Sequence, residues 1–170
     1  YLMAPDRGAW PLGDSGPGVG GLAVEKDALD PIRRSDYCLA MEIAVGTSGY
    51  NYPEWKGSFY PDPFPASKMF AYYAERFRTV EINYTFYRMP TPELTAKWRA
   101  QAPEGFRYTL KAPKRITHQQ RLVDCKDSLA MFVDSARGLG PHLASLLFQL
   151  PPNLKCDVLR LERFVEILPT

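Results

Sequence analysis

Short apolar runs alternate with longer amphipathic segments along most of this chain. Four short runs have the length and composition of strands buried in a sheet, at residues 42–45, 79–83, 106–111 and 145–150. Four longer segments carry apolar residues at helical spacing and are predicted as helices, at residues 66–78, 93–101, 124–139 and 157–168. A loop is predicted over 84–92. The pattern therefore predicts four strand and helix units in succession.

This alternation is typical of right-handed βαβ units, in which parallel strands form a sheet that helices cover. Two α/β architectures fit it. A doubly wound open sheet can be complete with about four strands, whereas a TIM barrel has eight strands and about 250 residues, so this chain would supply its first half. Both architectures bind ligands at the carboxyl ends of the strands. A site is therefore expected there in either case.

The composition is that of a globular protein. Hydrophobic residues make up 45% of the 170 residues and aromatic residues 13%, which argues against general disorder. No apolar run approaches the roughly 18 residues of a membrane-spanning helix, so no membrane partner is expected. Cys38, Cys125 and Cys156 are widely spaced, and no secretory signal is visible. These features favour a cytoplasmic protein with reduced thiols.

Residues 1–40 differ from the rest of the chain. Gly and Pro are scattered through them without a sustained hydrophobic period, so they offer little apolar surface to offset the entropy of ordering. The chain opens on Tyr1, and Met41 stands directly before the first predicted strand. We therefore interpret residues 1–40 as a loose leader and residues 41–170 as the folded domain.

Positive charge gathers in one segment of the chain. The formal net charge is only +2, but residues 105–123 contain five Lys or Arg and no carboxylate. An uncompensated cluster of this kind favours an anionic partner nearby. A solvated basic face would have the same composition, so both interpretations stay open.

Four segments carry a resemblance to a known family. They read GTSGYNYPEWKGSFYP, TVEINYTFYRMP, FRYTLKAPKRITH and LLFQLPPN. In this order and spacing they resemble the YecE-like family, the domain of unknown function numbered seventy-two, over residues 41–170. The resemblance implies a (β/α)8 TIM barrel, truncated here to about four βα units. It implies no established activity. The family's barrel is similar to those of the apurinic endonuclease and xylose isomerase class, which suggests phosphate-containing, sugar or nucleic-acid ligands by analogy.

Polar side chains stand at the ends of the second and third predicted strands. Glu81 and Asn83 share one face, because successive side chains of a strand alternate, and Lys111 ends the next strand. A carboxylate among apolar neighbours is costly unless it is paired or used. Glu81 is therefore a catalytic candidate, with Asn83 and Lys111 as ligand-binding candidates. A structural salt bridge between Glu81 and Lys111 is the alternative.

Two loops after strands add further candidates. His118 lies among basic residues in KRITHQQR and is an acid/base candidate, with Arg115 as a ligand for negative charge. The alternative for His118 is a helix cap. Gln149 stands at the carboxyl end of the fourth predicted strand, where its amide can donate to and accept from a ligand. Alternatively, Gln149 satisfies the backbone of its loop.

The loop after the first predicted strand is rich in hydroxyl and aromatic groups. Thr47 and Ser48 can offer hydroxyl and backbone N–H groups to an anion. Tyr50, together with Tyr87 from the next loop, is a candidate for ligand stacking. Trp55 is expected instead to pack its loop onto the rim of the fold.

Several other chemistries are not supported by the sequence. No metal site is expected, because His118 and His142 are predicted at opposite ends of the sheet, and no cofactor motif is present. Two functions remain. The first is a TIM-barrel hydrolase or isomerase that acts on an anionic ligand (phosphorylated, nucleic-acid or sugar-like), with Glu81 and His118 as acid/base candidates. The second is a non-catalytic nucleic-acid-binding module. Neither predicts an oligomeric state.

Overall fold

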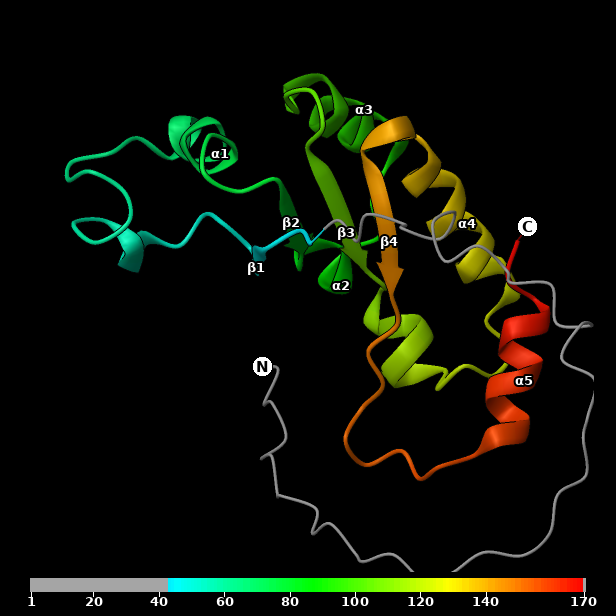
Figure 1. The fold of residues 1–170 in the computed structure, drawn as a ribbon. Helices are drawn as coiled ribbons and strands as arrows, with labels where there is room; N and C mark the ends of the chain where they lie inside the picture. The colour runs from blue at the N-terminus through cyan, green and yellow to red at the C-terminus, as the bar shows by residue number, and fades with distance from the viewer. Residues whose placement is uncertain (1–42, 170) are drawn as a thin grey trace, which may run out of the picture. The chain divides into compact units, whose positions relative to one another are not determined.

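The computed structural model describes residues 43–169 (Figure 1). In this range four strands form one sheet, namely β1 (Gly46–Ser48), β2 (Thr79–Ile82), β3 (Arg107–Lys111) and β4 (Leu143–Leu147). The α-helices are α1 (Ala66–Ala74), α2 (Tyr84–Tyr87), α3 (Pro92–Gln101), α4 (Lys126–Arg137) and α5 (Val158–Glu166). Short helical turns are η1 (Pro53–Trp55), η2 (Arg115–Gln119) and η3 (Gly140–His142). The predicted leader, residues 1–40, lies outside the described range.

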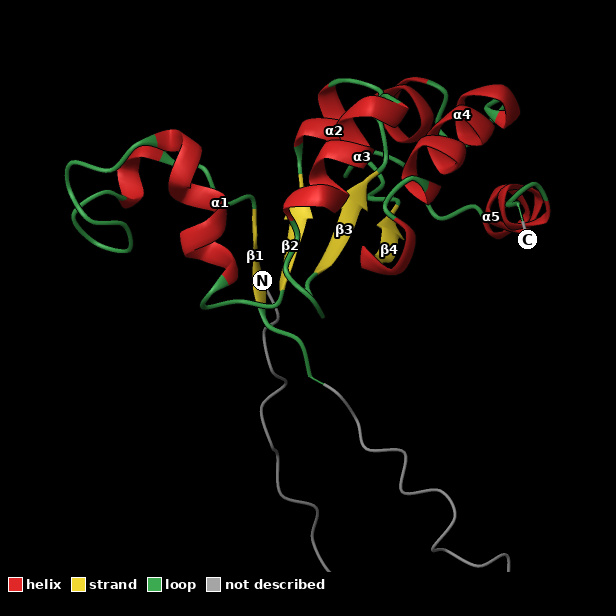
Figure 2. Cartoon of the chain, turned by 90° about the horizontal axis from the view of Figure 1, so that it is seen from above, coloured by secondary structure: helices red, strands yellow, loops and turns green. Residues whose placement is uncertain are grey.

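The strands follow one another in the sheet in the order β1-β2-β3-β4, and each pairs in parallel with the next. A doubly wound sheet reverses its strand order at a switch point, whereas here every new strand is added at the same edge. Viewed from above, α3 and α4 lie along one side of the row of strands, and α1 lies at the β1 end of the row (Figure 2). This α/β arrangement fits four consecutive units of a TIM barrel, as the resemblance implied.

Side-chain alternation gives the sheet a buried face and a more open face. Val80 and Ile82 of β2 and Tyr108 and Leu110 of β3 are buried. They form one core with buried side chains of the helices, including Phe70, Tyr73, Leu129, Phe132, Ala136 and Phe164. Glu81, between Val80 and Ile82, therefore lies on the opposite face, which corresponds to the interior of a barrel.

Tyr73 joins helix α1 to the two strands beside it. The side chain is completely buried, and its hydroxyl accepts a hydrogen bond from the Thr47 backbone N–H at 2.8 Å. The same hydroxyl donates to the Thr79 carbonyl at 2.9 Å. One phenol therefore satisfies a backbone group on β1 and another on β2, which is a specific tie that apolar contact alone would not provide.

The predicted first strand at 42–45 is wrong. Strand β1 begins only at Gly46, and the Ile43 and Val45 side chains just before it are 73% and 66% exposed. Gly46 pairs with Thr79, and a Cβ atom at Gly46 would lie 2.1 Å from the Thr79 carbonyl oxygen. The pairing thus needs a residue without a side chain, so it starts at the glycine and not in the apolar run.

Other boundaries differ by smaller amounts. The predicted helix 66–78 ends at Ala74, and the predicted loop 84–92 contains the short helix α2. Strand β4 begins two residues before the predicted 145–150, next to a register shift in its pairing with β3. The remaining strands and helices agree with the prediction to within about two residues at each end. No helix in residues 43–169 is both long and apolar enough to cross a membrane.

Candidate functional site

The register of the sheet brings three predicted residues together. Ser48 on β1 pairs directly with Glu81 on β2, and Glu81 pairs with Thr109 on β3. Lys111 follows Thr109 by two residues and is therefore a diagonal neighbour of Glu81 on the same face. All three strands run in parallel, so these side chains meet at the carboxyl ends of the strands, where ligands bind in both α/β architectures.

Hydrogen bonds and one ion pair connect four side chains at this point. The Asn83 Nδ2 donates to Ser48 Oγ at 2.6 Å, and Ser48 Oγ donates to Glu81 Oε1 at 3.1 Å. Lys111 Nζ lies 3.8 Å from the same oxygen. The second carboxylate oxygen, Oε2, makes no polar contact within the described residues. The carboxylate of Glu81 is thus held through one oxygen, while the other is open to a ligand.

The backbone of Lys111 is fixed by a residue that the sequence analysis missed. Thr85 is completely buried, and its hydroxyl lies 2.6 Å from the Lys111 carbonyl and 2.9 Å from the Ile82 carbonyl. It thereby ties the start of α2 to the ends of β2 and β3. A threonine three residues after a strand, which can bond back to the strand's last carbonyl, is a weak sequence signal for such a role.

His118 reaches the same rim from the loop after β3. It lies in η2, a π-helical turn, a feature that is frequent at functional sites. Its Nδ1 lies 2.9 Å from the hydroxyl of the buried Thr117, and its Nε2 makes no polar contact within residues 43–169. The imidazole packs edge-on against Phe86, with ring centroids 5.0 Å apart. Thr117, like Thr85, was not predicted.

Phe86 links His118 to the charged residues. Lys111 Nζ lies 5.3 Å from the centroid of the Phe86 ring, within the range of a cation–π contact. Lys111 and His118 therefore both contact this one ring. Within residues 43–169 no hydrogen bond or ion pair joins His118 to Glu81 or Lys111, so Phe86 is the contact that the two groups share.

Three other predicted residues lie in the loops that follow the strands. Arg115 begins η2, Tyr87 ends α2 and Gln149 follows β4 by two residues. All three are exposed, and none of their side chains forms a hydrogen bond or an ion pair within the described part of the chain. The Tyr87 ring packs on Phe86 at 5.1 Å. Their roles in ligand binding stay predictions.

Thr47 and Tyr50 lie on the helix side and not in this network. The Thr47 hydroxyl lies 3.0 Å from the Tyr73 hydroxyl, on the face of β1 opposite to Ser48. The Tyr50 ring packs against Phe70 at 5.3 Å, and burial raises the pKa of Tyr50. Thr47 and Tyr50 therefore contact residues of helix α1 on the buried face of the sheet. Because successive side chains of a strand point to opposite faces, the sequence already indicates that Thr47 and Ser48 cannot both face the network.

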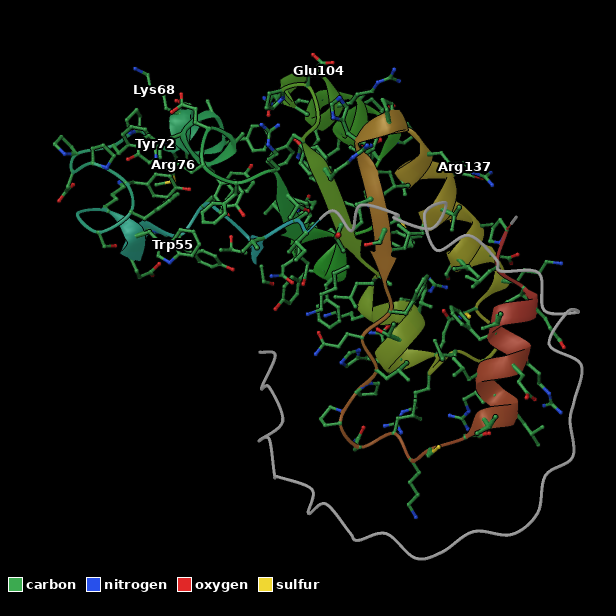
Figure 3. All side chains as sticks on the ribbon, viewed as in Figure 1. Trp55, Lys68, Tyr72, Arg76, Glu104 and Arg137 are labelled. Atoms are coloured by element: carbon green, nitrogen blue, oxygen red, sulfur yellow. The ribbon has the colours of Figure 1, made fainter. Side chains whose placement is uncertain are left out.

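The aromatic loop after β1 packs onto α1, as predicted for Trp55. The Trp55 ring contacts Phe59 at 5.6 Å, and Phe59 contacts Tyr73 at 6.2 Å. Figure 3 shows Trp55 in this loop, together with Tyr72 on α1 and Arg76, which follows the end of α1 by two residues. At the opposite end of the sheet, His142 Nδ1 lies 2.8 Å from the Phe106 carbonyl. This position confirms the prediction that the two histidines lie at opposite ends.

Comparison with known proteins gives consistent matches. The family model described as protein of unknown function DUF72 matches residues 44–170. The UPF0759 protein YecE of Escherichia coli K12 is 35% identical over 98 residues, which cover 57% of this chain and 36% of YecE. The UPF0759 protein YunF of Bacillus subtilis is 30% identical over 120 residues, covering 67% of this chain and 42% of YunF.

Solved structures give the same result. A DUF72 family protein of Thermotoga maritima matches with a TM-score of 0.66 and 31% identity, over 75% of this chain and 52% of that protein. A DUF72 family protein of Enterococcus faecalis matches with a TM-score of 0.51 and 23% identity, which speaks for the fold alone. The chain thus spans less than half the length of YecE and YunF and about half of the Thermotoga protein.

Proposed function

Because the chain belongs to the DUF72 family of proteins of unknown function, we propose a function from its own side chains: it forms part of a TIM-barrel hydrolase or isomerase that acts on an anionic ligand. The observation that carries this proposal is the connected network of Asn83, Ser48, Glu81 and Lys111 at the carboxyl ends of the strands. A structural salt bridge alone would not need the Ser48 hydroxyl on the same carboxylate oxygen as Lys111, nor the Asn83 amide that donates to this hydroxyl.

Lys111 is the group that would hold the negative charge of the ligand. Its ammonium lies 3.8 Å from Glu81, longer than a direct hydrogen bond, so a ligand oxygen can compete for it. Charge-assisted hydrogen bonds from Lys to phosphate are about twice as strong as neutral ones. The exposed Arg115, which has no ion pair within residues 43–169, can add a second cation from the adjacent turn.

Glu81 and His118 are the proton carriers of the proposal. The Glu81 carboxylate has an open oxygen and can remove a proton from the ligand. His118 has Nδ1 next to the Thr117 hydroxyl, and its Nε2 has no polar contact within residues 43–169, so the imidazole can donate or accept a second proton. Isomerisation and hydrolysis both need one group that takes a proton and another that gives one. Lys111 would stabilise the charge that develops between them.

A second candidate function is a non-catalytic nucleic-acid-binding module. Lys114 and Arg115 are both exposed, and residues 105–123 contain no carboxylate to neutralise them. The nearby Tyr87 ring is 69% exposed and can stack on a base. In this reading Glu81 would only position Lys111. Free thiols at Cys125 and Cys156 support a reducing, cytoplasmic location for either function.

The two functions are separated by ligand titration of this chain and its variants. Binding of ribose 5-phosphate and of a single-stranded oligothymidylate is measured by calorimetry at two salt concentrations. The variant Lys111→Met is compared with Lys68→Met, in which an exposed lysine is removed from α1 (Figure 3). Turnover of ribose 5-phosphate by the native chain and by Glu81→Gln is followed by phosphorus NMR.

For the enzyme, Lys111→Met should weaken binding of ribose 5-phosphate about tenfold or more, since it removes a charge-assisted contact of about 1.5–3 kcal/mol. Lys68→Met should not change it. Glu81→Gln should still bind but lose turnover. A binding module should instead prefer the oligonucleotide, lose affinity steeply with salt and tolerate Glu81→Gln. The enzyme proposal fails if neither Lys111→Met nor Glu81→Gln has an effect.

A further inference from the structure

A cavity of about 340 Å³ lies beside the Glu81 network, between the loop after β1 and helices α2 and α3. Its walls are mainly aromatic rings with two amide side chains, contributed by Tyr50, Tyr52, Tyr84, Trp98, Asn51 and Asn83. This volume is at the lower end of the range for small-molecule sites, and concave aromatic walls with a few polar groups are the usual composition of such sites. Among these wall residues, Tyr50 and Asn83 were predicted from the sequence as ligand-binding candidates.

The walls of the cavity are already in place. The Tyr52 hydroxyl donates to the Ser48 carbonyl at 2.6 Å, which closes the loop over the end of β1. The Trp98 carbonyl accepts from the hydroxyl of the buried Tyr108 at 3.0 Å. The Tyr52 side chain on one side and the Trp98 backbone on the other are therefore held by hydrogen bonds with the strands, which lowers the conformational entropy lost when a ligand enters.

The aromatic rings form a corner and not a parallel slot. The Tyr84 and Trp98 rings are 6.4 Å apart and almost perpendicular, at 87°. A flat base is best held between parallel rings, whereas a puckered sugar ring can place its C–H groups against two walls at right angles. Tyr84 is 48% exposed, so its ring is accessible from the cavity mouth. The geometry therefore favours a puckered sugar ring over a flat base.

The polar groups of the cavity suit hydroxyls. An Asn side chain offers both a donor and an acceptor, as the hydroxyls of a sugar require. Asn51 is exposed and makes no side-chain hydrogen bond within residues 43–169. Asn83 uses Nδ2 for Ser48, and its Oδ1 has no partner among the described residues. Both amides therefore keep hydrogen-bonding capacity for a ligand.

Asn83 also connects the cavity with the charged network. It lines the cavity and donates to Ser48, which in turn donates to Glu81 beside Lys111. We infer that the cavity is the subsite for the sugar ring of a phosphorylated sugar whose phosphate is held at Lys111. This inference rests on the proposed function, because it takes the anionic group at Lys111 as given and adds the neutral part of the ligand.

The test separates the sugar subsite from the anion site. Binding of inorganic phosphate, ribose, ribose 5-phosphate and thymidine 5′-monophosphate is measured by calorimetry on the native chain. The variants are Tyr84→Ala and Asn51→Ala, which change exposed walls of the cavity, and Lys111→Met. Met131→Ala, which truncates an exposed apolar side chain on α4, is the control. Circular dichroism verifies that each variant is folded.

If the inference is right, Tyr84→Ala and Asn51→Ala should each weaken the binding of ribose 5-phosphate about tenfold and leave the binding of inorganic phosphate unchanged. Lys111→Met should weaken the binding of both ribose 5-phosphate and inorganic phosphate, whereas Met131→Ala should change the binding of neither. Trp98 lines the cavity, so ribose 5-phosphate should also change the tryptophan emission, and Trp98→Phe should remove that change.

Two results would overturn the sugar subsite while the proposed function survives. One is ribose 5-phosphate binding that depends on Lys111 but is insensitive to both cavity variants. The other is thymidine monophosphate binding more tightly than ribose 5-phosphate in a Tyr84-dependent way, which would assign the cavity to a base. If neither phosphate nor ribose 5-phosphate binds, the proposed function fails together with this inference.

Discussion

Lys111 Nζ lies 3.8 Å from Glu81 Oε1, and the two side chains are only 18% and 24% exposed. They belong to neighbouring strands and are diagonal neighbours on one face of the sheet. The separation is too long for a direct hydrogen bond but short enough for electrostatic attraction, which partial burial strengthens relative to a pair in open solvent. The pair is therefore a structural contact, and an anionic ligand can still compete with Glu81 for the Lys111 ammonium.

The Glu81 and Lys111 pair should show measurable coupling in a double-mutant cycle. We expect a coupling of about 1 kcal/mol between Glu81→Gln and Lys111→Met in the free energy of unfolding by urea. The pair of Glu75 and Arg76 on the surface, with side chains 70% and 40% exposed, should give at most about 0.5 kcal/mol. Equal couplings for the two pairs would contradict a special environment at Glu81.

Tyr73→Phe should destabilise the fold by about 1–3 kcal/mol. The substitution removes the hydroxyl that bonds to the Thr47 N–H and the Thr79 carbonyl, and it leaves these partly buried groups without that partner. Urea unfolding measures the change. Tyr72→Phe is the control, since the Tyr72 hydroxyl makes no hydrogen bond within the described residues, and it should cost less than about 0.5 kcal/mol. A similar loss of unfolding free energy in both variants would show that the Tyr73 hydroxyl does not stabilise the fold through its bonds to β1 and β2.

Gly46→Ala should be severely destabilising, by about 3 kcal/mol or more. The new Cβ would lie 2.1 Å from the Thr79 carbonyl oxygen, so the β1 and β2 backbones would have to separate. The neighbouring Val45→Ala removes an exposed side chain and should change the free energy of unfolding by less than about 0.5 kcal/mol. Thermal melting of the two variants tests this, and a folded Gly46→Ala with native stability would disprove the close approach.

The stability of the fold should fall at high pH through Tyr60. Burial, with smaller effects of neighbouring tyrosines, raises the pKa of Tyr60 to about 12. An unfolded tyrosine has a pKa of about 10. Between these values the unfolded state has lost the proton that the folded state keeps, so the free energy of unfolding decreases as pH rises from about 10 to 12. Below about pH 10 the contribution of Tyr60 is complete.

The measurement for Tyr60 is urea unfolding at several pH values in this window. Tyr60→Phe should flatten the decrease without abolishing it, because burial also raises the pKa of Tyr108. Tyr87→Phe, at an exposed position on α2, should leave the decrease as it is in the native chain. A pH dependence in Tyr60→Phe that is identical to that of the native chain would show that Tyr60 is not responsible.

Much of the fold could be predicted from local patterns. The order of strands and helices, the parallel sheet and the placement of Glu81 and Lys111 near strand ends followed from apolar periodicity and from the loops between elements. The first strand could not be located this way, because its pairing begins at Gly46, where the backbone of Thr79 approaches too closely for any side chain. An apolar run marks burial in general, and here Ile43 and Val45 are exposed.

Part of the candidate site also followed from the sequence. Ser48, Asn83, Glu81 and Lys111 were candidates by their position, and the structure connects them. Thr85 and Thr117, which hold Lys111 and His118, gave only weak signals, because a hydroxyl that bonds to a backbone carbonyl or to an adjacent ring leaves no periodic pattern.

The sequence by itself determined which residue types stand at the ends of which strands, and to which family the chain belongs, because both depend on neighbours along the chain. The tertiary structure alone decided that Ser48 faces Glu81, that Lys111 lies diagonal to it, and that Tyr84 and Trp98 meet at a corner. These relations depend on strand register and on the packing of distant segments, which are set by backbone hydrogen bonds between strands and by the space available between side chains.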